Sequence, residues 1–230
     1  MSEQLPFEFQ FRPAQAAEDF LVAPTNAEAV AWLDRWPQWP APALAVFGPA
    51  RCGKTHLARV FKAQTAAVTV TSEGLRSAEP PQILGRAMAC VLDDAEDCVL
   101  EGLEEPLLHL YNTVAETGRT MLLVSERPPS RWTMGLADLR SRLRAAPAVG
   151  IGEPDDALMA AVIVKLFADR QIRLDDGVLS FILPRIERTF AAAQALVDAA
   201  DAASLASKRA ITVPLVRRVL ADLESQRNDA

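Results

Sequence analysis

The sequence has few cysteines and histidines, the residues that form disulfides in exported proteins and bind structural metals. Its 230 residues include three cysteines and two histidines, and neither set has metal-ligand spacing. It has no run of 18 apolar residues and no basic-then-apolar leader in its first thirty positions. These absences argue against a membrane protein and against a disulfide scaffold. They predict a cytoplasmic protein with reduced thiols.

Positive charge is also in deficit. The chain carries 24 Lys and Arg against 30 Asp and Glu, for a net charge of −6. Because non-specific affinity for DNA comes mainly from phosphate neutralisation, we expect DNA to be reached only indirectly, through a partner. Half of the residues are hydrophobic, which is enough for a core and excludes disorder as the default expectation.

Short apolar or β-branched runs alternate with helical patterns in the first part of the chain. The strands are expected at 43–47, 67–71, 88–92, 120–124 and 148–151, and the clearest helical periodicity covers 55–64 and 103–117. Strands alternating with helices favour parallel pairing with right-handed crossovers. The sequence therefore predicts an α/β fold with a parallel five-stranded sheet flanked by helices, and a ligand at the carboxyl ends of its strands.

The pattern changes after residue 153, where no further strand is indicated. Helices are expected at 155–171, 177–186, 191–206 and 213–225, and the acidic pairs Asp155-Asp156 and Asp175-Asp176 suit helix amino ends. We therefore predict three parts: a flexible tail over residues 1–15, a P-loop nucleotide-binding domain over 16–152, and a small all-helical domain over 153–230.

The strongest chemical signal is a full G-x-x-x-x-G-K-[ST] match between an expected strand and an expected helix. It consists of Gly48, Pro49, Ala50, Arg51, Cys52, Gly53, Lys54 and Thr55. The glycines allow backbone N–H groups to converge on phosphates, the lysine supplies a mobile cation, and the threonine offers a hydroxyl to Mg²⁺. The motif predicts a nucleotide site.

Two acidic residues close the expected strand at 88–92. Asp93 is the candidate Mg²⁺ ligand, and Asp94 is the candidate that orients or deprotonates an attacking water. The alternative is a pair of helix caps at the strand exit. Ser125, at the end of the strand at 120–124, is a third candidate, because it places a polar group near the terminal phosphate.

Arg140 and Arg142 lie in an expected helical run near the last strand. In an assembly of such domains, one of these arginines could stabilise phosphoryl transfer at the neighbour's nucleotide. The alternative is an ordinary solvated basic face, which is the commoner role of an arginine pair.

Taken together, these segments resemble the AAA+ module of the replication initiator DnaA and, since no DNA-binding domain follows, the regulatory Hda proteins related to it. The matching segments are 18–26, 53–57, 92–94, 110–112, 125–129 and 139–143. The resemblance implies that the helical domain is a lid and that Arg142 is an arginine finger. It also implies a site for ADP or ATP with Mg²⁺, formed by the P-loop, His56 and an adenine pocket around Phe20, Val22 and Asn26.

The amino-terminal segment is similar to the peptide with which Hda proteins bind the DNA polymerase III β sliding clamp. Gln4 would supply directional hydrogen bonds, while Leu5, Phe7 and Phe9 would fill an apolar groove. The alternative is a tail that folds back on the core. The implied partners are thus DnaA and the clamp, with a homo-oligomer as a further possibility.

One position departs from the family pattern. Ala191 stands where the lid helix of these proteins places an arginine on the nucleotide, and Arg188 is the nearest substitute. Regulation of DnaA is the first functional hypothesis. Two alternatives remain: a self-contained ATPase of the helicase-loader type, and a DnaA-related anchoring protein.

Overall fold

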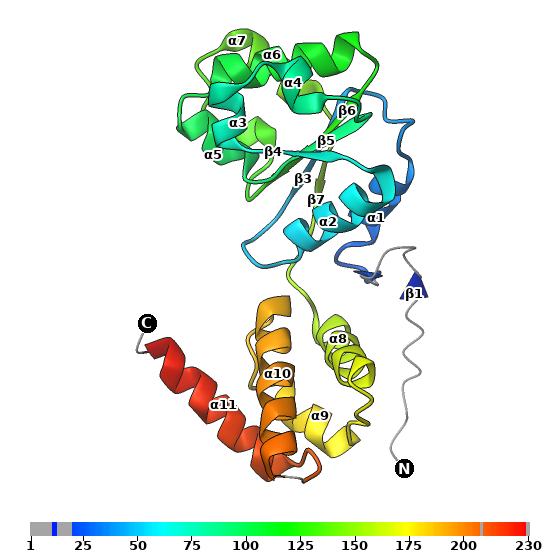
Figure 1. The fold of residues 1–230 in the computed structure, drawn as a ribbon, viewed down its shortest axis with the longest axis vertical. Coiled ribbons are helices and arrows are strands. Elements are labelled where there is room, and N and C mark those ends of the chain that lie inside the picture. The colour runs from blue at the N-terminus through cyan, green and yellow to red at the C-terminus, as the bar shows by residue number, and fades with distance from the viewer. Residues whose placement is uncertain (1–10, 13–19, 208, 229–230) are drawn as a thin grey trace. The chain divides into compact units, whose positions relative to one another are not determined.

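The computed structural model describes residues 11–12, 20–207 and 209–228 (Figure 1). The chain divides into two compact units, one over residues 11–152 and the other over 153–230. No helix in the described ranges is both long enough and apolar enough to span a lipid bilayer. Each unit has a hydrophobic core of its own and is described separately.

The first unit is built on a sheet of five parallel strands. They are β3 (Ala43–Phe47), β4 (Val68–Val70), β5 (Ala89–Leu92), β6 (Thr120–Ser125) and β7 (Ala148–Gly150). Their spatial order is β4-β5-β6-β3-β7, and every neighbouring pair is parallel. This confirms the expected α/β fold. The expected bounds of β3 hold, whereas the other strands differ by one residue at one or both ends.

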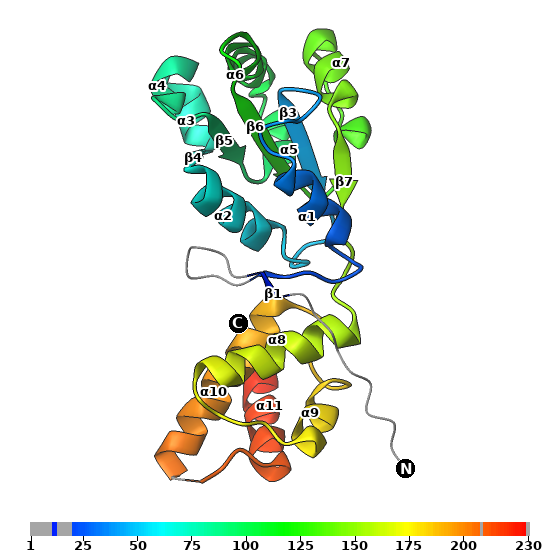
Figure 2. The same cartoon turned by 90° about the vertical axis from the view of Figure 1, so that its right-hand side faces the viewer.

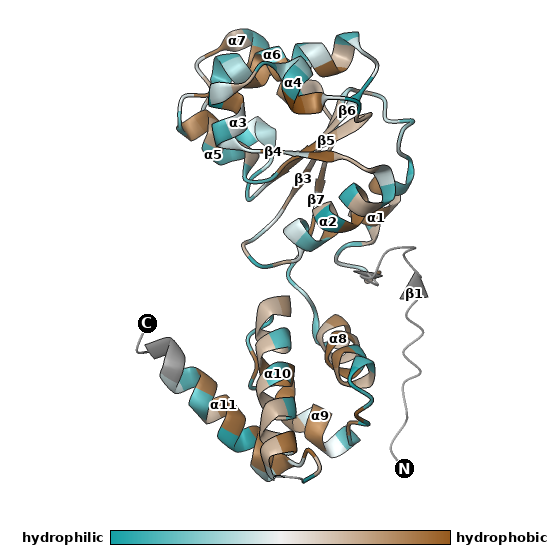
Figure 3. Ribbon diagram, viewed as in Figure 1, coloured by the Kyte–Doolittle hydropathy of each residue, from teal (hydrophilic) through white to brown (hydrophobic). Residues whose placement is uncertain are grey.

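Helices cover both faces of this sheet because its strands are apolar on both sides (Figures 2 and 3). One face packs against α1 (Ala27–Asp34) and α2 (Lys54–Thr65). The other face packs against α3 (Ser72–Ser77), α4 (Pro80–Leu84), α5 (Ala95–Leu100), α6 (Glu104–Glu116) and α7 (Ala137–Ala145). A short 3₁₀ turn, η1 (Pro129–Arg131), precedes α7.

Tryptophans in the segment before β3 fix its approach to the sheet. Trp39 stacks on the buried Phe61 of α2 at 5.5 Å, and Trp36 meets the same ring edge-on at 6.2 Å. The Trp36 indole donates to Thr120 Oγ1 at the start of β6, at 2.8 Å. Because β3 leads directly into the P-loop, this packing also holds the loop's first residue in place.

Residues 11–12 are the described part of the segment for which a flexible tail over residues 1–15 is expected. There, β1 (Phe11–Arg12) pairs antiparallel with β2 (Phe20–Leu21). Backbone hydrogen bonds can pair such short extended segments without any hydrophobic periodicity in the sequence.

The described residues of the second unit form four helices: α8 (Asp156–Asp169), α9 (Asp176–Ile182), α10 (Phe190–Ser207) and α11 (Val213–Asn228). Their apolar sides meet in one core that includes the fully buried Phe167, Leu196 and Val216. The expected acidic starts are present, since Asp155 caps α8 by accepting from Leu158 N at 2.7 Å and Asp175 accepts from Gly177 N at 2.8 Å. This unit confirms the expected all-helical domain after the sheet.

Candidate functional site

The sheet order brings the expected site residues to one edge. β6 lies between β3 and β5, so Ser125 at its end stands between the P-loop that follows β3 and the acidic pair that follows β5. In the register, Ser125 lies opposite Phe47, the last residue of β3. The carboxyl ends of these three parallel strands therefore form the candidate site.

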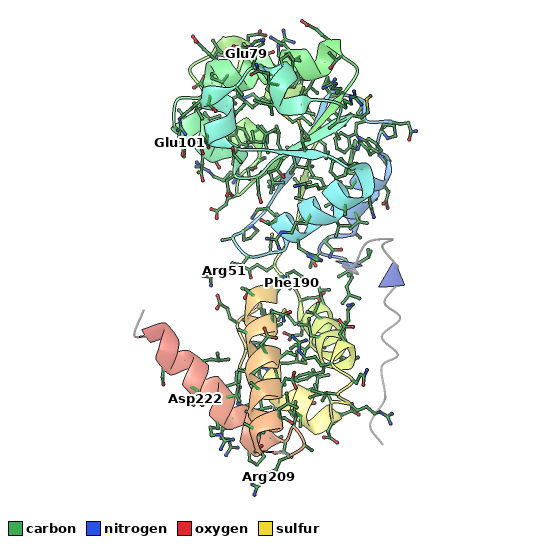
Figure 4. The ribbon with its side chains drawn as sticks, viewed as in Figure 1. Arg51, Glu79, Glu101, Phe190, Arg209 and Asp222 are labelled. Atoms are coloured by element: carbon green, nitrogen blue, oxygen red, sulfur yellow. The ribbon has the colours of Figure 1, made fainter. Side chains whose placement is uncertain are left out.

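The backbone of the P-loop has the geometry that the motif requires. Gly53 has φ 103° and Arg51 has φ 63°, so the loop turns twice through left-handed conformations before α2 begins at Lys54. No side chain caps the amino end of α2, so its first N–H groups are left to the loop interior. Arg51 is exposed and projects from the loop (Figure 4).

Gly48 can only be glycine in this setting. A Cβ at that position would lie 2.3 Å from the carbonyl oxygen of Ile151 and 3.0 Å from Cys52 Sγ. The first residue of the loop is therefore pressed against the segment that follows β7, and this contact fixes where the phosphate cradle starts.

Lys54 is the main charge of the loop and is only 8% exposed. Its Nζ donates to Gly48 O at 2.9 Å and to Pro49 O at 2.7 Å, across the loop. Lys54 lowers the pKa of the buried Cys52 thiol, but burial dominates and raises that pKa overall. Thr55 is exposed on the first turn of α2, and His56 beside it is half-buried.

The acidic pair ends β5 in a strained turn. Asp94 has φ 52°, and its N–H donates to Asp93 Oδ1 at 3.2 Å. Desolvation, followed by the charges of Asp93 and Asp97, raises the pKa of Asp94, while Lys54 opposes that shift. Asp94 occupies the amino-cap position of α5, yet its side chain makes no capping hydrogen bond. The helix-cap alternative therefore has no support at Asp94.

The donor set fits a magnesium nucleotide. A glycine cradle, an uncapped helix start and a buried lysine suit phosphate oxygens, while the Thr55 hydroxyl and the Asp93 carboxylate are hard oxygen ligands. Mg²⁺ usually takes only one or two protein ligands beside phosphates and waters. Among the described residues no group of three His, Cys, Asp or Glu could hold a metal by itself, so the phosphates would have to complete such a site.

Ser125 is 1% exposed, and its hydroxyl donates to Arg127 O at 2.8 Å. The Arg127 side chain in turn pairs with Glu96 of α5, a residue that the sequence analysis did not single out. This pair raises the pKa of Arg127 and links the segment after Ser125 to the helix that follows the acidic pair. The sequence does not distinguish Glu96 from the neighbouring Asp97, because its burial is a property of the fold.

Of the three residues assigned to the adenine pocket, Val22 is half-buried and packs against the core that contains α1 and α2. The Asn26 side chain accepts from Ala23 N at 2.8 Å and donates to Leu21 O at 3.0 Å, so it shapes the turn itself. Phe20 lies in β2, and its side chain is outside the described set. Nearby, Thr25 Oγ1 is buried and has no hydrogen-bond partner among the residues that the structure describes, so this polar atom is available to a ligand.

Arg142 lies on α7, which is anchored by the fully buried Leu139 and Leu143. Its Nε donates to Asp138 Oδ1 at 3.0 Å, and its guanidinium lies 5.8 Å from the ring centre of Tyr111. The bond to Asp138 is the only hydrogen bond of the Arg142 side chain within the part of the chain that is described, so both terminal NH₂ groups remain available. Arg140, by contrast, is bonded to the carbonyl of Met134.

Two further expectations concern the other parts of the chain. Ala191 is exposed in the first turn of α10, and Arg188 pairs with Asp156 of the same unit at 2.8 Å. Gln4, Leu5, Phe7 and Phe9 lie outside the described residues.

Comparison with known proteins shows which families and structures this chain resembles. Residues 156–220 match the family model of the Hda lid domain. Domain III of DnaA from Thermotoga maritima superposes with a TM-score of 0.76 at 18% identity, over 88% of this chain and 94% of that one. The first match identifies an Hda-type lid over residues 156–220, and the second shows that the chain shares the fold of DnaA domain III. This confirms the expected resemblance.

One further solved structure shares the fold, and one sequence relative covers most of the chain. AMPPCP-bound DnaA from Aquifex aeolicus superposes with a TM-score of 0.67 at 17% identity, over 82% of this chain and 65% of that one. An uncharacterized protein of Haemophilus influenzae is 28% identical over 189 residues, which are 78% of this chain and 81% of that protein.

Proposed function

We propose that this protein regulates the initiation of chromosomal replication by stimulating ATP hydrolysis on DnaA through Arg142. The observation that carries the proposal is the state of that side chain. Its Nε is held by Asp138, while its two terminal NH₂ groups have no hydrogen-bond partner among the described residues. A planar fork with free terminal donors suits a phosphoryl group in transfer on a neighbouring molecule.

The protein's own nucleotide site would have a different task. The cradle that starts at Gly48, the buried Lys54 and the carboxylate of Asp93 support binding of ADP or ATP with Mg²⁺. When bound, the metal would neutralise phosphate charge, and Thr55 and Asp93 would hold it. With alanine at position 191, we propose that this nucleotide acts mainly as a structural switch.

The proposed partners follow from the family of the lid and from the amino-terminal peptide. DnaA would supply the ATP that is hydrolysed. The β sliding clamp on DNA would bind Gln4, Leu5, Phe7 and Phe9, which would explain how an acidic protein acts near DNA. The cytoplasm is the compartment in which these partners meet.

The decisive experiment measures hydrolysis of ATP preloaded on DnaA, in the presence of DNA-loaded clamp. Arg142→Ala is expected to lower the stimulated rate by at least about 1000-fold, the contribution typical of an arginine finger. Arg144→Ala is the matched control, because Arg144 lies on the same helix and its side chain donates to Ser130 O. Equal rates for Arg142→Ala and the unmodified protein would overturn the proposal.

Clamp binding needs a separate test. A variant with Gln4, Leu5 and Phe7 changed to alanine should lose binding to immobilised clamp, whereas Gln10→Ala should keep it. Stimulation of DnaA by the triple variant should then no longer depend on the clamp. Unchanged binding would remove the peptide from the proposal and leave the role of Arg142 to be judged by its own assay.

One observation favours a second function, that of a self-contained ATPase. Asp94 stands beside Asp93 at the P-loop edge in a left-handed backbone conformation, a position suited to activating water. This function predicts steady hydrolysis without DnaA that Asp94→Asn abolishes. The regulatory function predicts little such hydrolysis, and no effect of Asp94→Asn on stimulation of DnaA.

A further inference from the structure

Glu104, at the start of α6, makes a long-range contact with the beginning of α7. Its Oε1 accepts from Gly135 N at 2.8 Å, and its Oε2 accepts from Leu136 N at 2.5 Å. Leu136 is the cap residue of α7, and no side chain of that helix caps its own amino end. A single carboxylate, 31 and 32 residues away in sequence, thus receives two backbone donors at the positive end of the helix.

Other contacts hold the sides of α7, whereas Glu104 binds its amino end. Leu139 and Leu143 are buried against the sheet core, which fixes one side of the helix. Arg140 donates to Met134 O at 2.9 Å and Arg144 donates to Ser130 O at 3.4 Å, so two arginines tie the helix to the preceding loop. Glu104 ties that loop to α6 by two hydrogen bonds, beside the apolar packing of Trp132 and Met134 in the same core.

α6 also carries the ring on which Arg142 lies. Tyr111 is 6% exposed, and the Arg142 guanidinium stands 5.8 Å from its centre. Glu104 and Tyr111 lie two turns apart on the same helix, so α6 contacts both the start of α7 and the arginine near its end. A shift of α7 along α6 would move the guanidinium off the ring.

We infer that Glu104 is a positioning residue for Arg142: by holding Gly135 N and Leu136 N it fixes where α7 presents its guanidinium. This inference rests on the proposed function. In this role Glu104 acts through the placement of α7. Loss of the carboxylate leaves two backbone donors without their acceptor, so the loop moves and the fork is displaced from the geometry that the transition state requires.

The test compares Glu104→Ala, Glu104→Gln and the neighbouring control Glu105→Ala in the DnaA hydrolysis assay. Glu105 is exposed on α6, and its side chain makes no hydrogen bond in the described part of the chain. Glu104→Ala is expected to lower the maximal stimulated rate ~10-fold with little change in the half-saturating concentration. Glu104→Gln keeps one acceptor oxygen and should recover most of the rate, while Glu105→Ala should match the unmodified protein.

Two readouts separate positioning from general destabilisation. Amide exchange at Gly135 and Leu136 should accelerate in Glu104→Ala, with unchanged exchange in the β3 and β6 strands. The double variant Glu104→Ala/Arg142→Ala should be no slower than Arg142→Ala alone, because Glu104 acts only through that arginine.

Additive losses in the double variant, or a Glu104→Ala rate equal to that of the unmodified protein, would overturn the inference about Glu104 while leaving Arg142 in its role. A fully active Arg142→Ala would instead overturn the proposed function, and the positioning role with it. Accelerated exchange throughout the unit in Glu104→Ala would assign Glu104 to stability alone.

Discussion

Two cations of the same unit are held in opposite ways. Lys54 is buried in the P-loop, and its ammonium bonds across the loop to two carbonyl oxygens. The Arg142 side chain is 40% exposed on α7, held at Nε by Asp138, with its terminal donors free among the described residues. The first arrangement suits a ligand that enters the protein's own cleft, and the second suits phosphate brought by another molecule. The two functions should therefore fail separately.

The sharpest way to separate them is Lys54→Ala. Lys54 is the buried charged side chain of the loop. Its removal should weaken the binding of ADP and ATP by about 100-fold, because charge-assisted hydrogen bonds to phosphate are lost. Titration calorimetry with magnesium measures this. Lys62→Ala is the control, since that lysine is exposed on the same helix and bonds to Thr69. If Arg142→Ala also lost nucleotide binding, the two functions would not be separate.

Gly48→Ala tests whether the backbone of the loop matters as much as its charge. The added Cβ would meet Ile151 O at 2.3 Å, so we expect a loss of about 2 kcal/mol in the free energy of unfolding, as for overpacked sites. Urea denaturation measures it. Gly74→Ala is the control, because its Cβ would meet only Thr71 Oγ1, at 3.3 Å, and should change stability by less than about 1 kcal/mol. Equal losses in both variants would refute the contact argument.

Asp93→Asn probes the metal side of the same cleft. The carboxylate is proposed to hold Mg²⁺, so its loss should remove the effect of magnesium on ATP affinity, a change of about 10-fold. Calorimetry with and without magnesium gives the comparison. Asp97→Asn is the control, since Asp97 is exposed on α5. If ATP affinity still depends on magnesium in Asp93→Asn, a residue other than Asp93 must hold the metal.

The sequence analysis was most successful where chemistry and local pattern coincide. The P-loop runs from the end of β3 into the first turn of α2, and the acidic pair directly follows β5. Both could be predicted because a short apolar run followed by polar residues is a clear sequence pattern. The lid helices were foreseen from periodicity and from aspartates at their starts. Short elements such as α1, α3 and α5 were missed, since they are too short to show a period.

Contacts made across the fold were not accessible from the pattern. Glu104 meets Gly135 and Leu136 only because α6 and α7 pack on the same face of the sheet. Asn26 matched the family's adenine segment, yet its side chain is hydrogen-bonded to the backbone of Leu21 and Ala23. The sequence predicted which arginine to examine, and only the side-chain geometry distinguishes Arg142 from the loop-bound Arg140.

The smallest expected effect concerns the restraint on Arg142 itself. Asp138 is 53% exposed and four residues before Arg142 on α7, so their pair contributes only about 0.3–0.5 kcal/mol, less in high salt. If the pair aims the fork, Asp138→Ala should lower stimulation of DnaA about 2-fold by that measure, and Asp138→Asn should restore it. Ser141→Ala, on the exposed side of the helix, is the control. Faster hydrolysis with Asp138→Ala would mean that the carboxylate competes with phosphate for the guanidinium, so that the surface pair restrains the finger and does not aim it.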